Sequence, residues 1–140
     1  HRVSIWSESG KLLTTVAESL KRPVRVATAA SGDAWYVFDS ATFSIQAFDG
    51  ANKPQRTIGK KGSEPTGTFR AIPFLEVDAA GHLLAADPSR IDVQKFDGQL
   101  GTSLMAQPGG ADFSGIADFA TDPFRGLYVL DGEGHLAVIR

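Results

Sequence analysis

The stretch Trp35-Tyr36-Val37-Phe38-Asp39 is an apolar run that ends in an aspartate, and the same pattern occurs twice more. It returns as Leu83-Leu84-Ala85-Ala86-Asp87 and as Leu127-Tyr128-Val129-Leu130-Asp131. The spacing is 48 positions from Asp39 to Asp87 and 44 positions from Asp87 to Asp131. That period is too long for a helical hairpin repeat and fits a unit of about four strands.

A second pattern follows the first and supports the same period. Ile45-Gln46-Ala47-Phe48-Asp49-Gly50 matches Val93-Gln94-Lys95-Phe96-Asp97-Gly98 at the same spacing of 48 positions. These apolar runs stop at glycine, aspartate, asparagine or proline, which is how strands end. No window keeps apolar residues at helical spacing, and 15 glycines and 7 prolines interrupt the chain. The sequence therefore predicts an all-β fold, a β-propeller of four-stranded antiparallel blades.

The repeats divide the chain into two whole blades and two partial ones. Residues 1–17 are predicted to end a preceding blade, 18–59 and 60–105 to form one blade each, and 106–140 to form an incomplete blade. Phe48, Phe96 and Trp6 are expected to fill the wedges between blades. Since a ring needs four to eight blades, we expect a fragment of a longer six-bladed chain. The alternatives are that several copies join or that another chain supplies the missing blades.

The connection between the two whole blades resembles a known repeat family. Residues 57–69 read Thr-Ile-Gly-Lys-Lys-Gly-Ser-Glu-Pro-Thr-Gly-Thr-Phe, and Pro73 and then Val77-Asp78-Ala79-Ala80-Gly81 follow. This is similar to the glycine-rich crossover of NHL-repeat β-propellers, and the resemblance covers about three repeats. It implies a scaffold fold. Some NHL propellers bind RNA through a positive face, and related propellers act as metal-dependent lyases or lactonases with ligands near the central channel.

Composition sets limits on the function. The 14 basic and 16 acidic residues leave a net charge of −2, so no global positive field marks a nucleic-acid binder. The chain has no cysteine, which excludes a disulfide framework and thiolate metal sites. Its apolar runs are too short for a membrane-spanning helix. The alanine- and aspartate-rich composition favours a periplasmic or extracellular location.

The recurrent acidic residues are interpreted as structural. Asp39, Asp87 and Asp131 recur at one position and are expected to cap turns, as are Asp78 and Asp122, because aspartate accepts hydrogen bonds from turn backbones. His82 and His135 fall at different phases of the repeat and are interpreted as turn or surface residues. No catalytic residue, metal ligand set or cofactor is predicted.

One inner-strand carboxylate keeps an enzymatic alternative open. Val26, Glu76 and Ala120 are expected at equivalent positions of successive inner strands, and only Glu76 could bind a metal. A metal-dependent lyase or lactonase would then need the missing blades to complete its site.

A cluster of cations is the main candidate for recognition. Lys53, Arg56, Lys60 and Lys61 lie within nine positions, and Arg70 is near. The predicted surface contacts are Lys60, Lys61, Glu64 and Arg70. The leading hypothesis is a non-enzymatic binding or structural module that contacts a protein, the remaining blades or an extracellular polymer. RNA binding is the second alternative, and the acidic net charge speaks against it.

Overall fold

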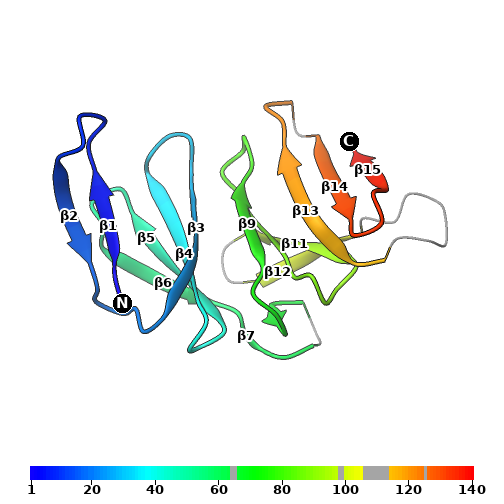
Figure 1. The fold of residues 1–140 in the computed structure, drawn as a ribbon, viewed down its shortest axis with the longest axis horizontal. Helices are drawn as coiled ribbons and strands as arrows, with labels where there is room; N and C mark the ends of the chain where they lie inside the picture. The colour runs from blue at the N-terminus through cyan, green and yellow to red at the C-terminus, as the bar shows by residue number, and fades with distance from the viewer. Residues whose placement is uncertain (64–65, 98–99, 106–113, 125) are drawn as a thin grey trace.

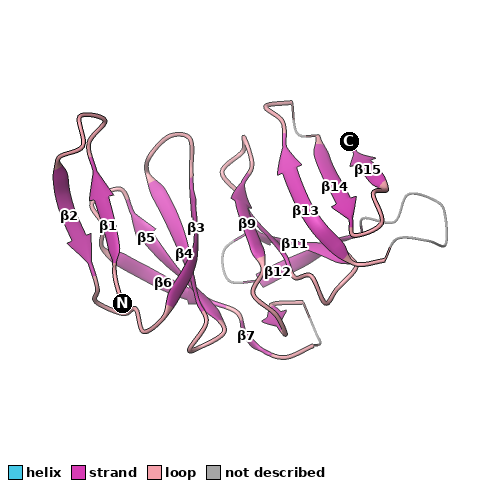
Figure 2. Ribbon diagram, in the orientation of Figure 1, coloured by secondary structure: helices cyan, strands magenta, loops and turns pink. Residues whose placement is uncertain are grey.

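The structure is a computed structural model that describes residues 1–63, 66–97, 100–105, 114–124 and 126–140. Every regular element in these ranges is a β-strand, as Figure 2 shows. The predicted all-β class is therefore confirmed.

Two sheets have four strands each, with every neighbouring pair antiparallel. Their orders are β3-β4-β5-β6 and β12-β11-β10-β9, so each sheet is a meander in chain order. The bounds are Pro23–Thr28 (β3), Ala34–Asp39 (β4), Ser44–Asp49 (β5), Pro54–Ile58 (β6), Phe74–Val77 (β9), Leu83–Ala86 (β10), Asp92–Asp97 (β11) and Leu100–Met105 (β12). Strands β4 and β10 are buried along nearly their whole length, which explains their continuous apolar sequences.

Smaller sheets flank these two. At the N-terminal end, β1 (Val3–Trp6) pairs with β2 (Leu12–Val16). At the C-terminal end, β13 (Ile116–Thr121), β14 (Leu127–Asp131) and β15 (Leu136–Ile139) form a three-stranded sheet. Between β6 and β9, the two-residue strands β7 (Lys60–Lys61) and β8 (Thr68–Phe69) pair in parallel.

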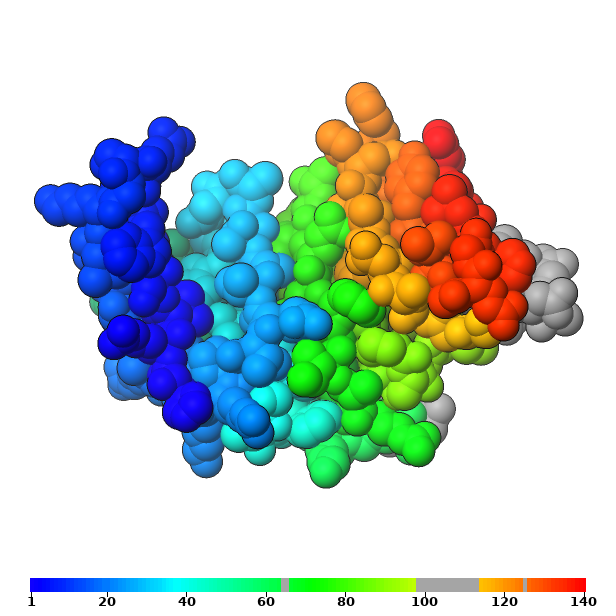
Figure 3. Space-filling view, viewed as in Figure 1, coloured from blue at the N-terminus to red at the C-terminus, as the bar shows by residue number. Residues whose placement is uncertain are grey.

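The sheets stand side by side in an arc that follows the chain (Figure 1). The first strands of successive sheets are neighbours, because β3 contacts β9 and β9 contacts β13. The space-filling view shows the same succession of colours, from blue to red along the long axis (Figure 3). First strands that meet while later strands fan outward give the geometry of propeller blades.

Apolar side chains fill the wedge between the two four-stranded sheets. Phe69 is fully buried there and meets Phe38 edge-on with ring centroids 5.4 Å apart. Phe96, with its centroid 6.2 Å from that of Phe69, comes from the opposite sheet. Burying one such phenylalanine contributes about 2–3 kcal/mol. A single blade cannot cover both of its faces, so this wedge joins the two sheets into one body.

The expectation for the wedge residues is confirmed for two of three. Phe48 and Phe96 are buried, and Phe48 stacks on Trp35 at 4.2 Å. Trp6 is 58% exposed and packs in no wedge between the described sheets, so its place in a wedge stays a prediction. Side chains alternate along a strand, and it is Val3 and Ile5 of β1 that pack toward β3–β6. Trp6 therefore points to the other face, which no described strand covers.

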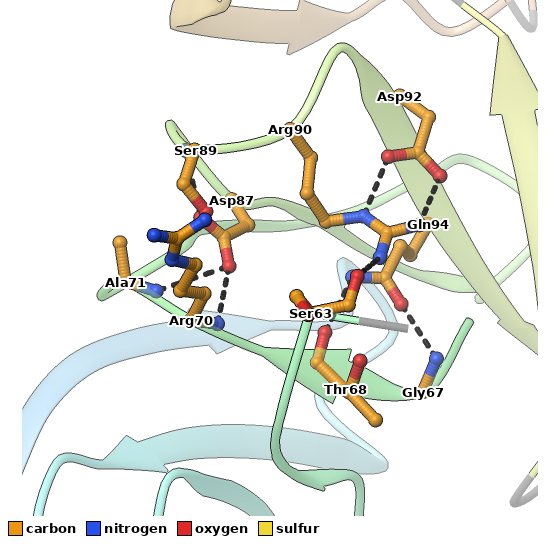
Figure 4. A network of polar contacts seen from close by, with 10 residues as sticks. All are labelled: Ser63, Gly67, Thr68, Arg70, Ala71, Asp87, Ser89, Arg90, Asp92 and Gln94. Atoms are coloured by element: carbon orange, nitrogen blue, oxygen red, sulfur yellow. Dashed lines mark hydrogen bonds and ion pairs between the residues drawn. The ribbon is translucent and has the colours of Figure 1, made fainter. Parts of the chain in front are cut away.

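Asp87 closes the second four-stranded sheet by joining two distant backbone segments (Figure 4). Its Oδ2 accepts the N–H groups of Arg70 at 2.7 Å and Ala71 at 3.1 Å, where the chain enters the sheet. Its Oδ1 accepts the N–H of Ser89 at 2.8 Å, in the turn that follows β10. The carboxylate thus ties the entry of the first strand to the exit of the second.

The same clamp occurs in the sheets on either side. Asp39 and Asp131 also use one oxygen for the entering chain and the other for the residue two positions later. The N–H donors are those of Lys21, Arg22 and Ala41 for Asp39, and those of Ser114 and Glu133 for Asp131. The predicted turn-capping role is confirmed, and the bond to a segment 16 to 18 positions earlier adds a second role.

We predict that Asp87→Ala lowers the free energy of unfolding by about 3 kcal/mol, because it removes charge-assisted hydrogen bonds and leaves partly buried N–H groups without their acceptor. Chemical denaturation of the two proteins measures the difference. Asp33→Ala is the matched control, since Asp33 is exposed and accepts a hydrogen bond from the hydroxyl of Ser31, and it should cost less than about 1 kcal/mol. Equal losses for both variants would contradict the clamp.

Candidate functional site

The crossover between β6 and β9 carries the cations that the sequence singled out. It turns at Gly59, which has φ of +77°, and a Cβ there would lie 2.5 Å from Cε2 of Phe69. Only glycine allows the chain to turn so close to this buried ring. The crossover then runs as β7, returns as β8 and enters β9.

Three polar side chains of the neighbouring sheet hold the crossover in place (Figure 4). Gln94, fully buried on β11, accepts the N–H of Gly67 at 2.7 Å and donates to the carbonyl of Thr68 at 3.0 Å. Arg90 forms a two-point pair with Asp92, with N···O distances of 2.6 and 2.8 Å. Its remaining nitrogen donates to the carbonyl of Ser63 at 2.8 Å. A buried and satisfied network of this kind fixes one loop conformation.

The structure exposes three of the four predicted contact residues. Lys60, Lys61 and Arg70 all present their side chains to solvent on the crossover, and Glu64 lies outside the described residues. The ammonium of Lys61 lies 5.2 Å from the ring centroid of Phe43, in the turn between β4 and β5. This cation–π contact joins the crossover to the neighbouring turn.

The structure separates the other cations of the predicted cluster. Lys53 directly precedes β6 in the β5–β6 turn and Lys60 follows the other end of the strand, about 20 Å away for an extended chain. Arg56 is half-buried within β6. The cations are close in sequence but do not form one cluster in space, because an extended strand separates residues by about 3.3 Å per position.

Sequence reasoning missed Lys21 and Arg22, which are exposed in the connection between β2 and β3. The backbone N–H of Arg22 binds Asp39 exactly as far back along the chain as that of Arg70 from Asp87, 17 positions. The equal spacing of 17 positions between each arginine and its clamp aspartate is the sequence signal that could have identified Arg22. The first crossover is short and lacks the glycine-rich motif, so no local pattern marks its cations as surface contacts.

These cations share one edge of the molecule. The connection before β3, the turn after β4 and the crossover before β9 all lie along the lower edge in Figure 1. We call this the crossover edge and define it by its exposed cations, which are Lys21, Arg22, Lys60, Lys61 and Arg70. Hydrogen bonds join its parts, because Ser40 of the β4–β5 turn donates its N–H to the carbonyl of Arg22.

The two clamp aspartates at this edge face inward, whereas Glu18 of the β2–β3 connection is exposed. Asp39 and Asp87 are 2% and 0% exposed. Burial would raise the pKa of Asp39, but the N–H groups of Arg22, Lys21 and Ala41 outweigh it and lower the pKa below the usual value. The carboxylates are thus occupied by backbone donors, while the cations extend to solvent.

Two histidines pair with turn aspartates. Nδ1 of His82 lies 3.0 Å from Asp78, and Nδ1 of His135 lies 2.8 Å from Asp131. Asp78 also accepts the N–H groups of Ala80 and His82, so its expected role as a turn cap is confirmed. Burial opposes ionisation of Asp131, but its bonds to His135 and to backbone donors bring the pKa well below the usual value.

Asp122 caps the equivalent turn of the third sheet. It accepts the N–H groups of Phe124 at 2.7 Å and Gly126 at 2.8 Å, and the hydroxyl of Tyr128 donates to it at 3.1 Å. Gly126 has no room for a side chain, because a Cβ there would overlap Oδ2 of Asp122. The predicted role of Asp122 is confirmed.

Strand pairing corrects the predicted set of inner-strand residues. Glu76 pairs with Leu84 and Ala120 with Tyr128, each three positions before the clamp aspartate. In the first sheet that position pairs with Ala27, not with Val26, so the expected equivalence of Val26 is wrong by one residue. Within the corrected set only Glu76 carries a potential metal ligand.

Glu76 is half-buried on β9, and its Oε2 has no hydrogen-bond partner among the described residues. Burial raises its pKa, Asp118 adds to the rise and hydrogen bonds from Thr121 oppose it. Over the described ranges, no group of three His, Cys, Asp or Glu residues is placed to hold a metal ion. No helix in that part of the chain is long and apolar enough to span a membrane.

Solved structures of known proteins share this architecture at low identity. The WD40 β-propeller domain of Doa1 matches with a TM-score of 0.67 and 11% identity, over 98% of this chain and 43% of that chain. A structure of virginiamycin B lyase from Staphylococcus aureus, in complex with quinupristin, matches with a TM-score of 0.65 and 10% identity, over 99% and 48%. Hydrazine synthase of Kuenenia stuttgartiensis gives 0.64 and 16%, over 100% and 44%.

These matches show the fold and no more than the fold. The chain is a segment of β-propeller that spans less than half the length of each of these three structures. No protein-family model and no curated protein sequence matches it. The NHL resemblance and the six-bladed ring remain predictions.

We predict that the protein loses stability as the pH falls below the ordinary aspartate pKa of 3.8. Because folding lowers the pKa of Asp39, Asp78 and Asp131, the unfolded state takes up protons first, and the stabilisation present above that pH is lost on acidification. Urea denaturation at a series of pH values measures the slope. Asp131→Asn should flatten it, and parallel curves for both proteins would contradict the prediction.

Proposed function

We propose that this propeller segment is a non-enzymatic binding module whose crossover edge docks an acidic segment of a partner protein. The observation that carries the proposal is the arrangement of charge at this edge. The clamp aspartates point inward and are saturated by backbone donors, and five cations point outward from the same segments. An edge of this kind attracts acidic partners although the chain is slightly acidic overall.

Rigidity supports a role in recognition. The cations stand on loops that the clamps, the Gln94 bonds and the Arg90–Asp92 pair hold in one conformation. A loop that is already ordered loses little conformational entropy when it binds. Short loops on a rigid repeat are a common way to build a recognition surface.

The matching structures fit either a binding or an enzymatic role, since they include a WD40 domain and a lyase. Similarity of fold therefore does not distinguish a binding role from an enzymatic one. The distinction depends on which side chains the described residues place at a possible site. In the described residues the recurrent aspartates serve as clamps and turn caps, whereas the crossover edge presents its cations to solvent, with Lys61 also in contact with the ring of Phe43. Metal-dependent catalysis stays an alternative through Glu76 alone, and RNA binding stays an alternative through the same cations.

We expect Lys60→Glu/Lys61→Glu to weaken binding to poly-L-glutamate by roughly 10- to 30-fold at low ionic strength, because two attractive contacts become repulsive. Fluorescence anisotropy of labelled poly-L-glutamate measures the affinity. Raising the salt concentration should weaken binding to the unmodified protein over the same range.

The control reverses two cations away from the crossover edge. Lys11 and Lys53 are exposed in the β1–β2 and β5–β6 turns, so Lys11→Glu/Lys53→Glu matches the change in net charge. Equal weakening by both double variants would mean that only net charge matters and would overturn the proposal. Tight binding of single-stranded RNA with none of poly-L-glutamate would favour the RNA alternative in its place.

A further inference from the structure

A cavity lies between the second four-stranded sheet and the C-terminal sheet, at the end opposite the crossover edge. Its volume is about 320 Å³. Leu84 on β10, Leu127 on β14 and Ile139 on β15 form its apolar wall. Its size lies at the small end of the range of ligand pockets in proteins.

The polar part of the lining holds three basic side chains. His82, Lys95 and Arg140 border the cavity, and they come from both sheets. Apolar walls with a few convergent polar groups at one side are the usual construction of a small-molecule site. The polar lining also includes the carboxylate of Asp78 and the hydroxyl of Thr121.

The acidic neighbours of the cavity are already engaged. Both oxygens of Asp78 accept from backbone N–H groups and from His82, at 2.8 to 3.0 Å. Asp122 accepts two backbone N–H groups and the hydroxyl of Tyr128. These donors are the ones that stabilise the turns, so the carboxylates are oriented by the fold rather than by the cations.

The two permanent cations make only long contacts with these groups. Nζ of Lys95 forms an ion pair with Asp78 at 3.7 Å, which is too long for a hydrogen bond. Arg140 donates to the hydroxyl of Tyr128 at 3.4 Å, a weak hydrogen bond. Both side chains therefore have donor capacity for an anion that enters the cavity.

We propose that the cavity binds a small carboxylate with an apolar body, whose carboxylate pairs with Lys95 and Arg140 and whose hydrocarbon part packs on Leu84, Leu127 and Ile139. A neutral ligand would form no ion pair with Lys95 or Arg140. A fully hydrophilic anion would leave the apolar wall in contact with water. The site is formed by two sheets together, so ligand binding also joins adjacent blades.

Hexanoate and its neutral isostere hexanamide test the site. We expect isothermal titration calorimetry to show hexanoate binding at least tenfold more tightly than hexanamide. Lys95→Gln and Arg140→Gln should each weaken hexanoate binding at least fivefold and leave hexanamide unchanged. Both positions are at the rim, and circular dichroism checks that each variant is folded.

A control at the crossover edge separates this site from the proposed function. Lys60→Gln should bind hexanoate as the unmodified protein does, and Lys95→Gln should bind poly-L-glutamate normally. Equal affinities for hexanoate and hexanamide, no saturable binding, or full affinity in both rim variants would each overturn the proposal. Loss of poly-L-glutamate binding in the Lys60→Glu/Lys61→Glu protein would bear only on the crossover edge.

Discussion

The hydrogen bonds from the clamp aspartates are the interaction on which this arrangement depends. Each joins the chain that enters a sheet to the turn that leaves its second strand, across 16 to 18 residues. Sheet pairing alone fixes strands relative to one another, but it does not fix the connection that arrives from the previous blade. The clamp does so with one buried charged group, and a buried charge is tolerated because backbone donors saturate it.

A structural demand therefore shapes the surface of the molecule. Fixing the entering backbone at Arg22 and Arg70 turns the negative charge inward and sends both basic side chains to solvent. The longer crossover adds Lys60 and Lys61 to the same edge. A nearly neutral chain thereby acquires an edge whose exposed charges are mainly of one sign, and exposed groups are the ones that a partner meets first.

The sequence predicted the fold well because its repeats constrain it. Apolar runs that end in aspartate at a blade-length spacing leave few alternatives to a propeller, and burial on both faces explains why β4 is continuously apolar. The expectation for an individual residue failed where its position depends on the register between paired strands. Val26 was expected at the position equivalent to Glu76, but Tyr36, three positions before its clamp aspartate, pairs with Ala27. A one-residue shift reverses the face of a strand side chain.

The candidate sites depend on contacts between blades, and such contacts have little trace in a local pattern. Lys95 and Arg140 are 45 positions apart, and only the packing of two sheets brings both to one cavity. The crossover edge likewise unites Lys21 with Lys61 through the turn that contains Phe43. Repetition specifies each blade and leaves its loops free to differ. Function in such a scaffold therefore resides in those differences, which explains why the fold could be predicted before the sites.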